Sequence, residues 1–596
     1  MAFTMRGRFV LTALIMTALA SAASAQISRH TRAAFGPIDE RSETPALRAA
    51  RLAIEDDAIR RFRATGQSPR VLVDGWDRFQ RACDRHQYAQ GAPEPLPYGT
   101  WGEAKESART LGYDYLILVE LWAGQEAPDN PAAGTPVELN YQVFDARDQS
   151  VVHAHRFVGN TIDLSGTLAS FCRNVGLNIG YNSSPQFDEA VTSMPCATND
   201  AFSSYWMGRG HLDLGMFDEA LASFQASLAS DPDYRAPALG VADVRLAMAR
   251  HALNNGEWDS GLTLIDQAIS DYATKAAYGG LADSLQVKAD LLIASGQKQA
   301  SWFARKSAAK ALLDWGRTSE AYTVALDVWD QMKAEGAPVD PDVAWLLGKC
   351  NVLLHGREDA NMAQADEYFA QALAVDEKHV PTLLDRGRMY LAWGSAYDPN
   401  LDADQKKWRI TWIGWAVNDF RSVTLHAPDD PEGWTELGNA FMAWSYRGDD
   451  ISADERSVSN DQIGQAIAHY QRALNLLKAQ KRELDPVMGQ LFLKLATCHR
   501  RIGRIDPAVD AAWNAQTILG TEDPQPWIEL IFVFVDGRDF DRARATYDEA
   551  ILAVPAAPSE LEKLSAYIDQ MEEKSLESGT TFRPHQWPNR RQWPPE

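Results

Sequence analysis

The sequence predicts two folded parts, a small α/β domain followed by an all-α superhelical solenoid of eight or nine helix pairs. Residues 46–185 alternate short apolar runs, typical of strands, with amphipathic helices. Residues 201–557 repeat one helix-turn-helix pattern. A chain of 596 residues also exceeds what one compact core holds, so division into such parts is expected.

The clearest repeat reads W-x2-L-G-x2-F at residues 434–441, followed by A-x3-Y-x2-A at residues 466–473. Its apolar residues fall at helical spacing, and Gly438 allows a second helix to cross the first at close range. This spacing resembles the tetratricopeptide repeat (TPR), a unit of about 34 residues. The resemblance implies a right-handed solenoid in which each unit covers the apolar face of the next.

Further copies carry the pattern along the solenoid, and the one with Ala249 and Ala268 is degenerate. Their positions include Gly208, Phe224, Ala249, Ala268, Leu347, Phe369, Gly387, Phe420, Ala496, Ala508, Trp527 and Tyr547. Residues 280–335 hold three helical segments, an odd number that leaves the register open there. A polar-faced helix over 558–576 is expected to cap the stack. The tail 577–596 lacks periodicity and is expected to be disordered. Its doubled Gln-Trp-Pro is either a docking peptide or part of a frayed end.

The α/β domain is predicted element by element. We expect a flexible mature N-terminus over 26–45, which carries two prolines, and a polar linker over 186–200. Between them lie the expected helices 47–63, 76–86, 101–112 and 164–179 and the expected strands 71–73, 115–121, 137–144 and 151–157. Asp145-Ala-Arg-Asp148 fits a hairpin turn between the last two strands.

Part of this domain resembles a known family. The segments Leu111-Gly-Tyr-Asp-Tyr-Leu116 and Asn140-Tyr-Gln-Val-Phe-Asp145, followed by the helix from Leu164, are similar to the N-terminal domain of the TolB family. The resemblance covers about 80 residues and rests on pattern alone. It implies a small α/β fold used for protein contacts in the cell envelope.

The first 25 residues predict export. Arg6 and Arg8 precede the apolar run 9–20, and Ala23-Ser-Ala25 fits cleavage before Gln26. We therefore expect a periplasmic or secreted protein without an integral membrane segment. Removal of the two arginines changes the net charge from −23 to −25, which argues against nucleic acid or anionic membrane as a partner.

Five cysteines are an odd number for an exported chain. One pair among Cys83, Cys172 and Cys196 is a candidate disulfide, and the sequence does not choose among the three pairings. Cys350 and Cys498 lie in distant repeats, so we expect buried thiols there.

No motif for catalysis stands out, because the chain lacks HExxH, a P-loop, G-x-S-x-G and CxxC. The 12 histidines lack metal-ligand spacing. We therefore expect no enzyme, no metal and no cofactor. A rival interpretation makes the α/β domain an enzyme or small-ligand sensor, with Asp74, Asp114 and Asp145 near strand ends as the first suspects.

The TPR resemblance also implies a binding site, since the first helix of each unit lines a concave groove in that family. Counting from the Leu-Gly landmark places polar and aromatic side chains there: Tyr205, Arg209, Trp345, Lys349, Arg388, Thr435, Asn439 and Arg500. Lys306 and Lys310 join them if a unit starts near 302. The row is similar to a Lys/Asn pattern that clamps a peptide carboxylate, and the alternative is an ordinary solvated helix face.

Residues 395–412 and 445–462 interrupt two units between their first and second helices. The first insertion carries Trp408 and Trp412, and ordinary loop growth is the alternative to a binding role.

We predict a scaffold that holds a protein or peptide partner in its groove, in assembly or maintenance of envelope complexes. The alternative is a factor for export or assembly of envelope polysaccharide.

Overall fold

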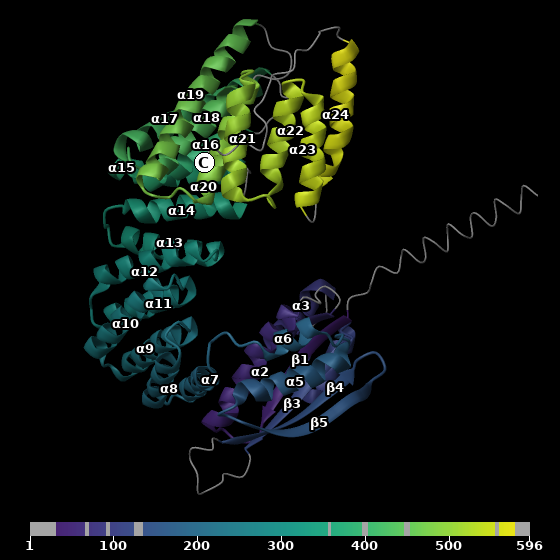
Figure 1. Cartoon of the computed structure of the whole chain (residues 1–596). Helices are drawn as coiled ribbons and strands as arrows, with labels where there is room; N and C mark the ends of the chain where they lie inside the picture. The colour runs from purple at the N-terminus through teal and green to yellow at the C-terminus, as the bar shows by residue number, and fades with distance from the viewer. Residues whose placement is uncertain are drawn as a thin grey trace, which may run out of the picture. The chain divides into compact units, whose positions relative to one another are not determined.

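The structure is a computed structural model that describes residues 31–65, 71–90, 96–123, 135–355, 359–395, 403–445, 453–554 and 559–577. It divides into two compact units, unit 1 (residues 1–304) and unit 2 (residues 305–596). The expected signal peptide and nearly all of the expected tail lie outside the described residues. Both predicted folds are present, because a five-stranded mixed sheet precedes a long series of helices (Figure 1).

The sheet of unit 1 has the strand order β2-β1-β3-β4-β5. Its strands are β1 (Thr31–Glu40), β2 (Val71–Asp74), β3 (Tyr115–Ala123), β4 (Pro136–Asp145) and β5 (Ser150–Asn160). β1 runs parallel to β2 and β3, whereas β3, β4 and β5 form an antiparallel meander. The expected hairpin is confirmed, and the Asp145 carboxylate accepts hydrogen bonds from the backbone N–H groups of Arg147 (2.8 Å) and Asp148 (3.1 Å) in its turn.

Strand β1 corrects the prediction of a flexible segment over 26–45. Residues 33–35 are fully buried between β2 and β3, with side chains that alternate between the two faces of the sheet. Pro37 cannot donate to a ladder, but it lies where the register with β3 shifts, between Phe35 and Ile38. The short apolar run over residues 33–35 was the sequence signal for β1, and the two prolines of the segment concealed it.

Helices cover both faces of the sheet. They are α2 (Pro45–Ala64), α3 (Trp76–Gln90), α4 (Trp101–Thr110) and α5 (Leu164–Ile179). α2 and α5 pack with Ile117, Val119 and Leu121 on one face. α3 and α4 pack with Leu116 and Leu118 on the other.

The expected linker 186–200 is also corrected, because it contains α6 (Pro185–Thr192) and the start of the first solenoid helix. Ser184 caps α6 by accepting from the Phe187 N–H (3.1 Å), and Pro185 occupies the first turn, where no N–H is needed. Phe187, Ala190 and Val191 are buried, so the segment packs as part of the domain.

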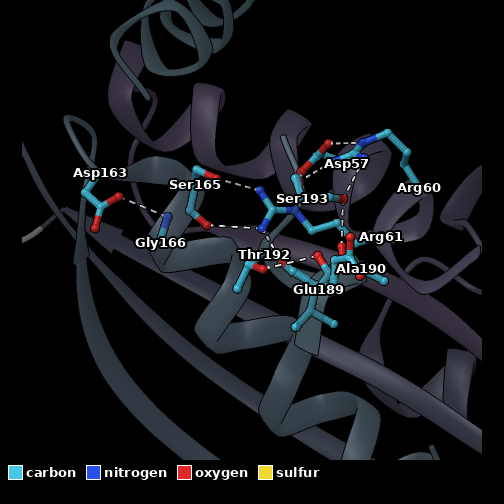
Figure 2. Close-up of polar contacts among 11 residues, drawn as sticks. Asp57, Arg60, Arg61, Asp163, Ser165, Gly166, Glu189, Ala190, Thr192 and Ser193 are labelled. Carbon is cyan, nitrogen blue, oxygen red and sulfur yellow. Dashed lines mark hydrogen bonds and ion pairs between the residues drawn. The ribbon is translucent and has the colours of Figure 1, made fainter. Parts of the chain in front are cut away.

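Two arginines of α2 hold the end of α6 in place (Figure 2). Arg61 is fully buried, donates to the Asp57 carboxylate (2.6 Å) and also binds the carbonyl oxygens of Ser165 (3.3 Å) and Val191. Arg60 donates to Asp57 (2.6 Å) and to the carbonyl oxygen of Ser193 (2.7 Å). The contacts with Val191 and Ser193 satisfy carbonyl groups at the C-terminus of α6, where cations are favoured.

The solenoid is built from helices, most of which pair with the next helix along the chain. Unit 1 contains α7 (Asn199–Asp213), α8 (Phe217–Ser230), α9 (Arg235–Asn255), α10 (Trp258–Thr274) and α11 (Tyr278–Ala294), and α12 (Lys298–Asp314) begins in it. Unit 2 continues with α13 (Thr318–Ala334), α14 (Pro341–His355), α15 (Asp359–Val375), α16 (Val380–Ser395), α17 (Ala403–His426), α18 (Pro431–Ser445), α19 (Ala453–Ala479), α20 (Pro486–Arg501), α21 (Ile505–Leu519), α22 (Pro524–Asp536), α23 (Phe540–Ala553) and α24 (Ser559–Glu577).

Close approach of the two helices of a pair explains why the pattern recurs at fixed spacing in this chain. A Cβ on Gly438 would lie 2.5 Å from the ring of Tyr470, and one on Gly348 would lie 2.6 Å from Phe369. An aromatic ring of the second helix therefore fills the space that a side chain would take on the first. The TPR-type solenoid expected from these residues is confirmed.

The register left open over 280–335 follows from ion pairs. Arg305 of α12 pairs with Asp327 of α13 (2.6 Å), and Lys306 of α12 reaches Asp342 of α14 (2.8 Å). In the same way, Arg386 and Arg388 of the first helix α16 bond to its own second helix and to the next first helix, respectively. α12 is therefore a first helix, as the alternative start near 302 supposed.

Both insertions lengthen a second helix. α17 spans 24 residues and α19 spans 27, whereas α15 spans 17. The parts at 396–402 and 446–452 lie outside the described residues. The remainder continues the helix, so ordinary loop growth does not describe the whole of either insertion.

All five cysteines are free thiols. Cys83 packs with α4 on one face of the sheet, and Cys172 lies in the core on the other face, which excludes that pairing. Cys350 and Cys498 are buried, and burial raises the pKa of each thiol to about 12.

Candidate protein-binding face

The predicted groove residues of unit 2 lie on first helices and form a row of polar contacts from one repeat to the next. Each cation of this row, which we call the first-helix row, contacts carboxylates on or directly before the following first helix. Its ion pairs join Lys306 to Asp340 and Asp342, Lys349 to Asp385, Arg388 to Glu432 and Glu436, and Arg500 to Glu529 and Asp536.

Lys349 and Trp345 of α14 converge on Asp385 of α16. The ammonium of Lys349 lies 3.1 Å from the carboxylate, and the Trp345 indole N–H donates to the same carboxylate oxygen at 2.7 Å. Lys349 also lies over the Trp345 ring, 5.3 Å from its centroid. Trp345 is only 8% exposed, so it holds Asp385 in place and offers little ring surface to a ligand.

Arg388 of α16 continues the row to α18. Its guanidinium pairs with Glu432 at 2.5 Å and with Glu436 at 2.8 Å, and Asp385 lies 3.6 Å away. Burial alone would lower the pKa of Arg388, but the two glutamates outweigh it and raise the pKa. Lys349, Asp385, Arg388 and Glu436 therefore form a continuous charged network over three repeats.

Asn439 extends this network within the best-conforming repeat. Its amide donates to Glu436 (2.9 Å), and its carbonyl oxygen accepts from the Tyr470 hydroxyl (2.9 Å). Thr435 donates to the carbonyl oxygen of Pro431 (2.8 Å) on its own helix. Both side chains are half-buried. Both the nitrogen and the oxygen of the Asn439 amide are therefore already hydrogen-bonded within the protein.

Arg500 repeats the arrangement between α20 and α22. It lies 2.9 Å from Glu529 and 2.9 Å from Asp536, and it stacks over Phe532 at 5.4 Å from the ring centroid. In unit 1, Arg209 donates to the Tyr205 hydroxyl at 3.3 Å. Burial would lower the pKa of Arg209, but Tyr205, Asp243 and Asp56 together raise it.

The acidic members of the row were not identified from the sequence. Among the described residues, the four cations Lys306, Lys349, Arg388 and Arg500 face seven carboxylates of the units that follow them. The row is thus net acidic, and a peptide carboxylate would have to displace a carboxylate already bound. These carboxylates could have been found by searching the following repeat for an acidic residue opposite each cation, such as Asp385 for Lys349.

Trp408 and Trp412 lie on α17 and form a cluster with Trp393 of α16. The Trp393 and Trp412 ring centroids are 5.0 Å apart with planes inclined by 34°, and those of Trp408 and Trp412 are 6.4 Å apart at 32°. Trp408 is 54% exposed. This cluster, the tryptophan shelf, presents rings of small mutual inclination to solvent.

The three aspartates of the rival ligand-site interpretation are engaged in structure. Asp74 accepts from the Tyr113 hydroxyl (2.8 Å). Asp114 is buried and accepts from the backbone N–H of Arg32 (2.8 Å), and Asp145 is buried in its hairpin turn.

Among the described residues, no three His, Cys, Asp or Glu side chains gather in a way that would hold a metal ion. No described helix combines the length and apolar character of a membrane span.

Helix pairs with small-to-aromatic contacts define the class of the protein as a TPR-type solenoid that carries an α/β domain. No protein-family model matches the sequence, and no curated protein matches it. Solved structures that resemble parts of the chain include a thermophilic TPR protein of Thermus thermophilus, with 17% identity and a TM-score of 0.27 over 39% of this chain and 100% of that one.

Two further likenesses are of the same kind. A tetratricopeptide repeat protein from Parabacteroides merdae has 10% identity and a TM-score of 0.31, over 53% of this chain and 98% of that one. The Pseudomonas aeruginosa pilF protein has 15% identity and a TM-score of 0.30, over 45% of this chain and 97% of that one.

Proposed function

We propose that this protein is a non-catalytic scaffold that holds a segment of another protein along the first-helix row of unit 2. The observation that carries the proposal is the continuous network from Lys349 to Asn439, which presents polar groups of three successive repeats on one set of helices. Solenoids use such repeated faces for extended partners. The excess of carboxylates favours a partner segment with basic side chains.

We further propose that the scaffold acts in the periplasm, in assembly or maintenance of envelope complexes. The basic and apolar residues 6–20 and the Ala-Ser-Ala site support export. Fractionation of cells that express the tagged chain, with the mature N-terminus sequenced, tests this part. Recovery in the cytoplasm with residue 1 or 2 as the N-terminus contradicts it.

Two arginines of α16 provide a matched test of the binding face. Arg388 faces α18 and joins the row, whereas Arg386 pairs with Asp419 of α17 (2.7 Å) within its own repeat. Arg388→Gln leaves Glu432 and Glu436 without their counter-ion and changes the charge of the row at one place. We expect affinity for the partner recovered by crosslinking from native envelopes to change at least about tenfold.

Arg386→Gln removes an ion pair of the same helix that lies outside the row, so it is expected to leave that affinity within about twofold. Equal effects of the two variants, or no effect of either, would contradict the proposed face. Far-UV circular dichroism of both variants checks that the fold is retained. Neutral changes are preferred to charge reversal, because a carboxylate at 388 would face three carboxylates.

The tryptophan shelf favours a second candidate function, binding of envelope polysaccharide. Trp408 is exposed, and the rings of the shelf lie at small mutual inclination, so they offer apolar faces to sugar C–H groups. Binding to a glycan array, lost in Trp408→Ala, would support it. Trp315→Ala is the control, since Trp315 is 50% exposed but stacks with an arginine in place of a second indole. Retained glycan binding in Trp408→Ala would exclude the shelf.

A further inference from the structure

A cleft of about 600 Å³ lies in unit 1, where the turn after β5 meets the first helix pair. Thr161 and Ile162 of the turn line the cleft together with residues of α7 and α8. The site is separate from the first-helix row on which the proposed function rests. Its volume is in the range of small-ligand sites.

The hydroxyl groups of two serines in the cleft already donate hydrogen bonds within the protein. Ser203 Oγ of α7 donates to the carbonyl oxygen of Ile162 (2.9 Å). Ser223 Oγ of α8 donates to the carbonyl oxygen of Glu219 (2.8 Å). A hydroxyl carries one proton, so both groups are left with lone pairs only and accept from a ligand.

His211 is an acceptor as well. Its Nδ1 lies 3.1 Å from Ser223 Oγ, and since that hydroxyl proton points to Glu219, Nδ1 is the donor of this contact. Nε2 then carries the lone pair. Burial lowers the pKa of His211, which keeps the ring neutral at neutral pH.

The charge of the cleft comes from Asp200, an exposed residue of α7. Its carboxylate has no hydrogen-bond or ion-pair partner in the described part of the chain. Among the described residues that line the cleft there is no lysine and no arginine. Met207, Ala222 and Ala226 add apolar wall beside these acceptors.

We infer that this cleft binds an alkylammonium or guanidinium group, with Asp200 as counter-ion, with Ser203, Ser223 and His211 as acceptors and with the apolar wall against the alkyl stem. Anions are excluded by the absence of a cationic donor in the described lining and by the carboxylate. The same chemistry is offered by a lysine or arginine side chain of a protein and by a free polyamine.

The test is calorimetric titration of the mature full-length chain with three probes. Acetyl-Gly-Lys-Gly-amide represents a protein side chain, spermidine represents a free polyamine, and acetyl-Gly-norleucine-Gly-amide lacks the ammonium group. Asp200→Asn removes the counter-ion at constant shape. Asp218→Asn is the control, because Asp218 is an acid in the first turn of α8 and does not line the cleft.

We expect at least one cationic probe to bind and to lose about tenfold in affinity in Asp200→Asn, with a change within about twofold in Asp218→Asn. The tighter of the two cationic probes identifies the source of the ligand. Equal binding of the norleucine peptide, equal effects of the two variants, or no binding of either cation at millimolar concentration would overturn the inference.

Discussion

Gly210 of α7 lies against Ala49 of α2, so the solenoid begins directly on the α/β domain. A Cβ on Gly210 would lie 2.5 Å from the carbonyl oxygen of Pro45 and 2.9 Å from the backbone nitrogen of Ala49. Phe202 and Trp206 of α7 also enter the core that α2 shares with the sheet. α2 thereby covers the first repeat helix, as a preceding repeat would, and supplies the N-terminal cap that a solenoid requires.

Gly210→Ala is predicted to destabilise unit 1. The added methyl group meets backbone atoms that cannot rotate away, and overpacking of this kind costs about 1–3 kcal/mol in the free energy of unfolding. Chemical denaturation measures the change. Gly464→Ala is the control, because a Cβ there meets nothing within 4 Å in helix α19 and alanine favours the helix. Equal stability of the two variants would contradict the close contact.

The second prediction concerns the buried arginine network. Arg61→Met keeps the apolar stem but leaves Asp57 without one of its partners and the Val191 carbonyl without a donor. Arg60 still pairs with Asp57. We therefore expect the free energy of unfolding to fall by about 3 kcal/mol, which is the lower end of the range for broken buried ion pairs. Arg63→Met, at an exposed position of the same helix, serves as the control.

Hydrogen exchange locates the effect of Arg61→Met. Amides of α6 are predicted to exchange faster in this variant, because the Val191 carbonyl at the end of that helix loses its donor. Unchanged protection of α6, together with unchanged stability, would show that the network does not hold the segment 185–193.

The predictability of this fold varied with the kind of signal. The repeats were predictable because Gly438 and Tyr470 report a local contact that recurs at fixed spacing. Strand β1 was missed, since its burial comes from β2 and β3, which are remote in sequence. α6 was missed because Arg60 and Arg61, more than 100 residues earlier, fix its end.

The candidate site was predictable only in part. The cations of the first-helix row follow from repeat position, since Lys349 and Arg388 occupy equivalent places. Their carboxylate partners depend on how successive repeats are rotated, which the sequence does not specify. The sequence therefore predicted a cationic row, whereas carboxylates such as Asp385 and Glu436 make the network acidic in the structure.

Buried histidines predict a dependence of stability on pH. Burial lowers the pKa of both His469 and His499 from about 6.5. The unfolded chain then binds more protons than the folded chain at mildly acidic pH. Their stabilising contribution is complete above about 6.5 and is lost as the pH falls from there toward the folded-state pKa.

Thermal melting at pH 7.5 and 5.5 measures this histidine contribution. His469→Gln with His499→Gln is predicted to reduce the loss of stability on acidification relative to the natural chain. This comparison separates the histidines from carboxylates such as Glu529, whose pKa burial raises and which act in the opposite direction. His426→Gln, at an exposed end of α17, is the control. An unchanged pH dependence in the double variant would contradict the prediction.

The central claim, that a partner lies along the first-helix row, is tested most directly by site-specific photocrosslinking in living cells. A photoreactive phenylalanine replaces Thr435 on the first helix α18, or Ser422 on the second helix α17, which lies outside the row. We predict that position 435 yields one discrete adduct with the same envelope protein in repeated experiments and that position 422 does not. Crosslinking to that protein from position 422 alone would contradict the account.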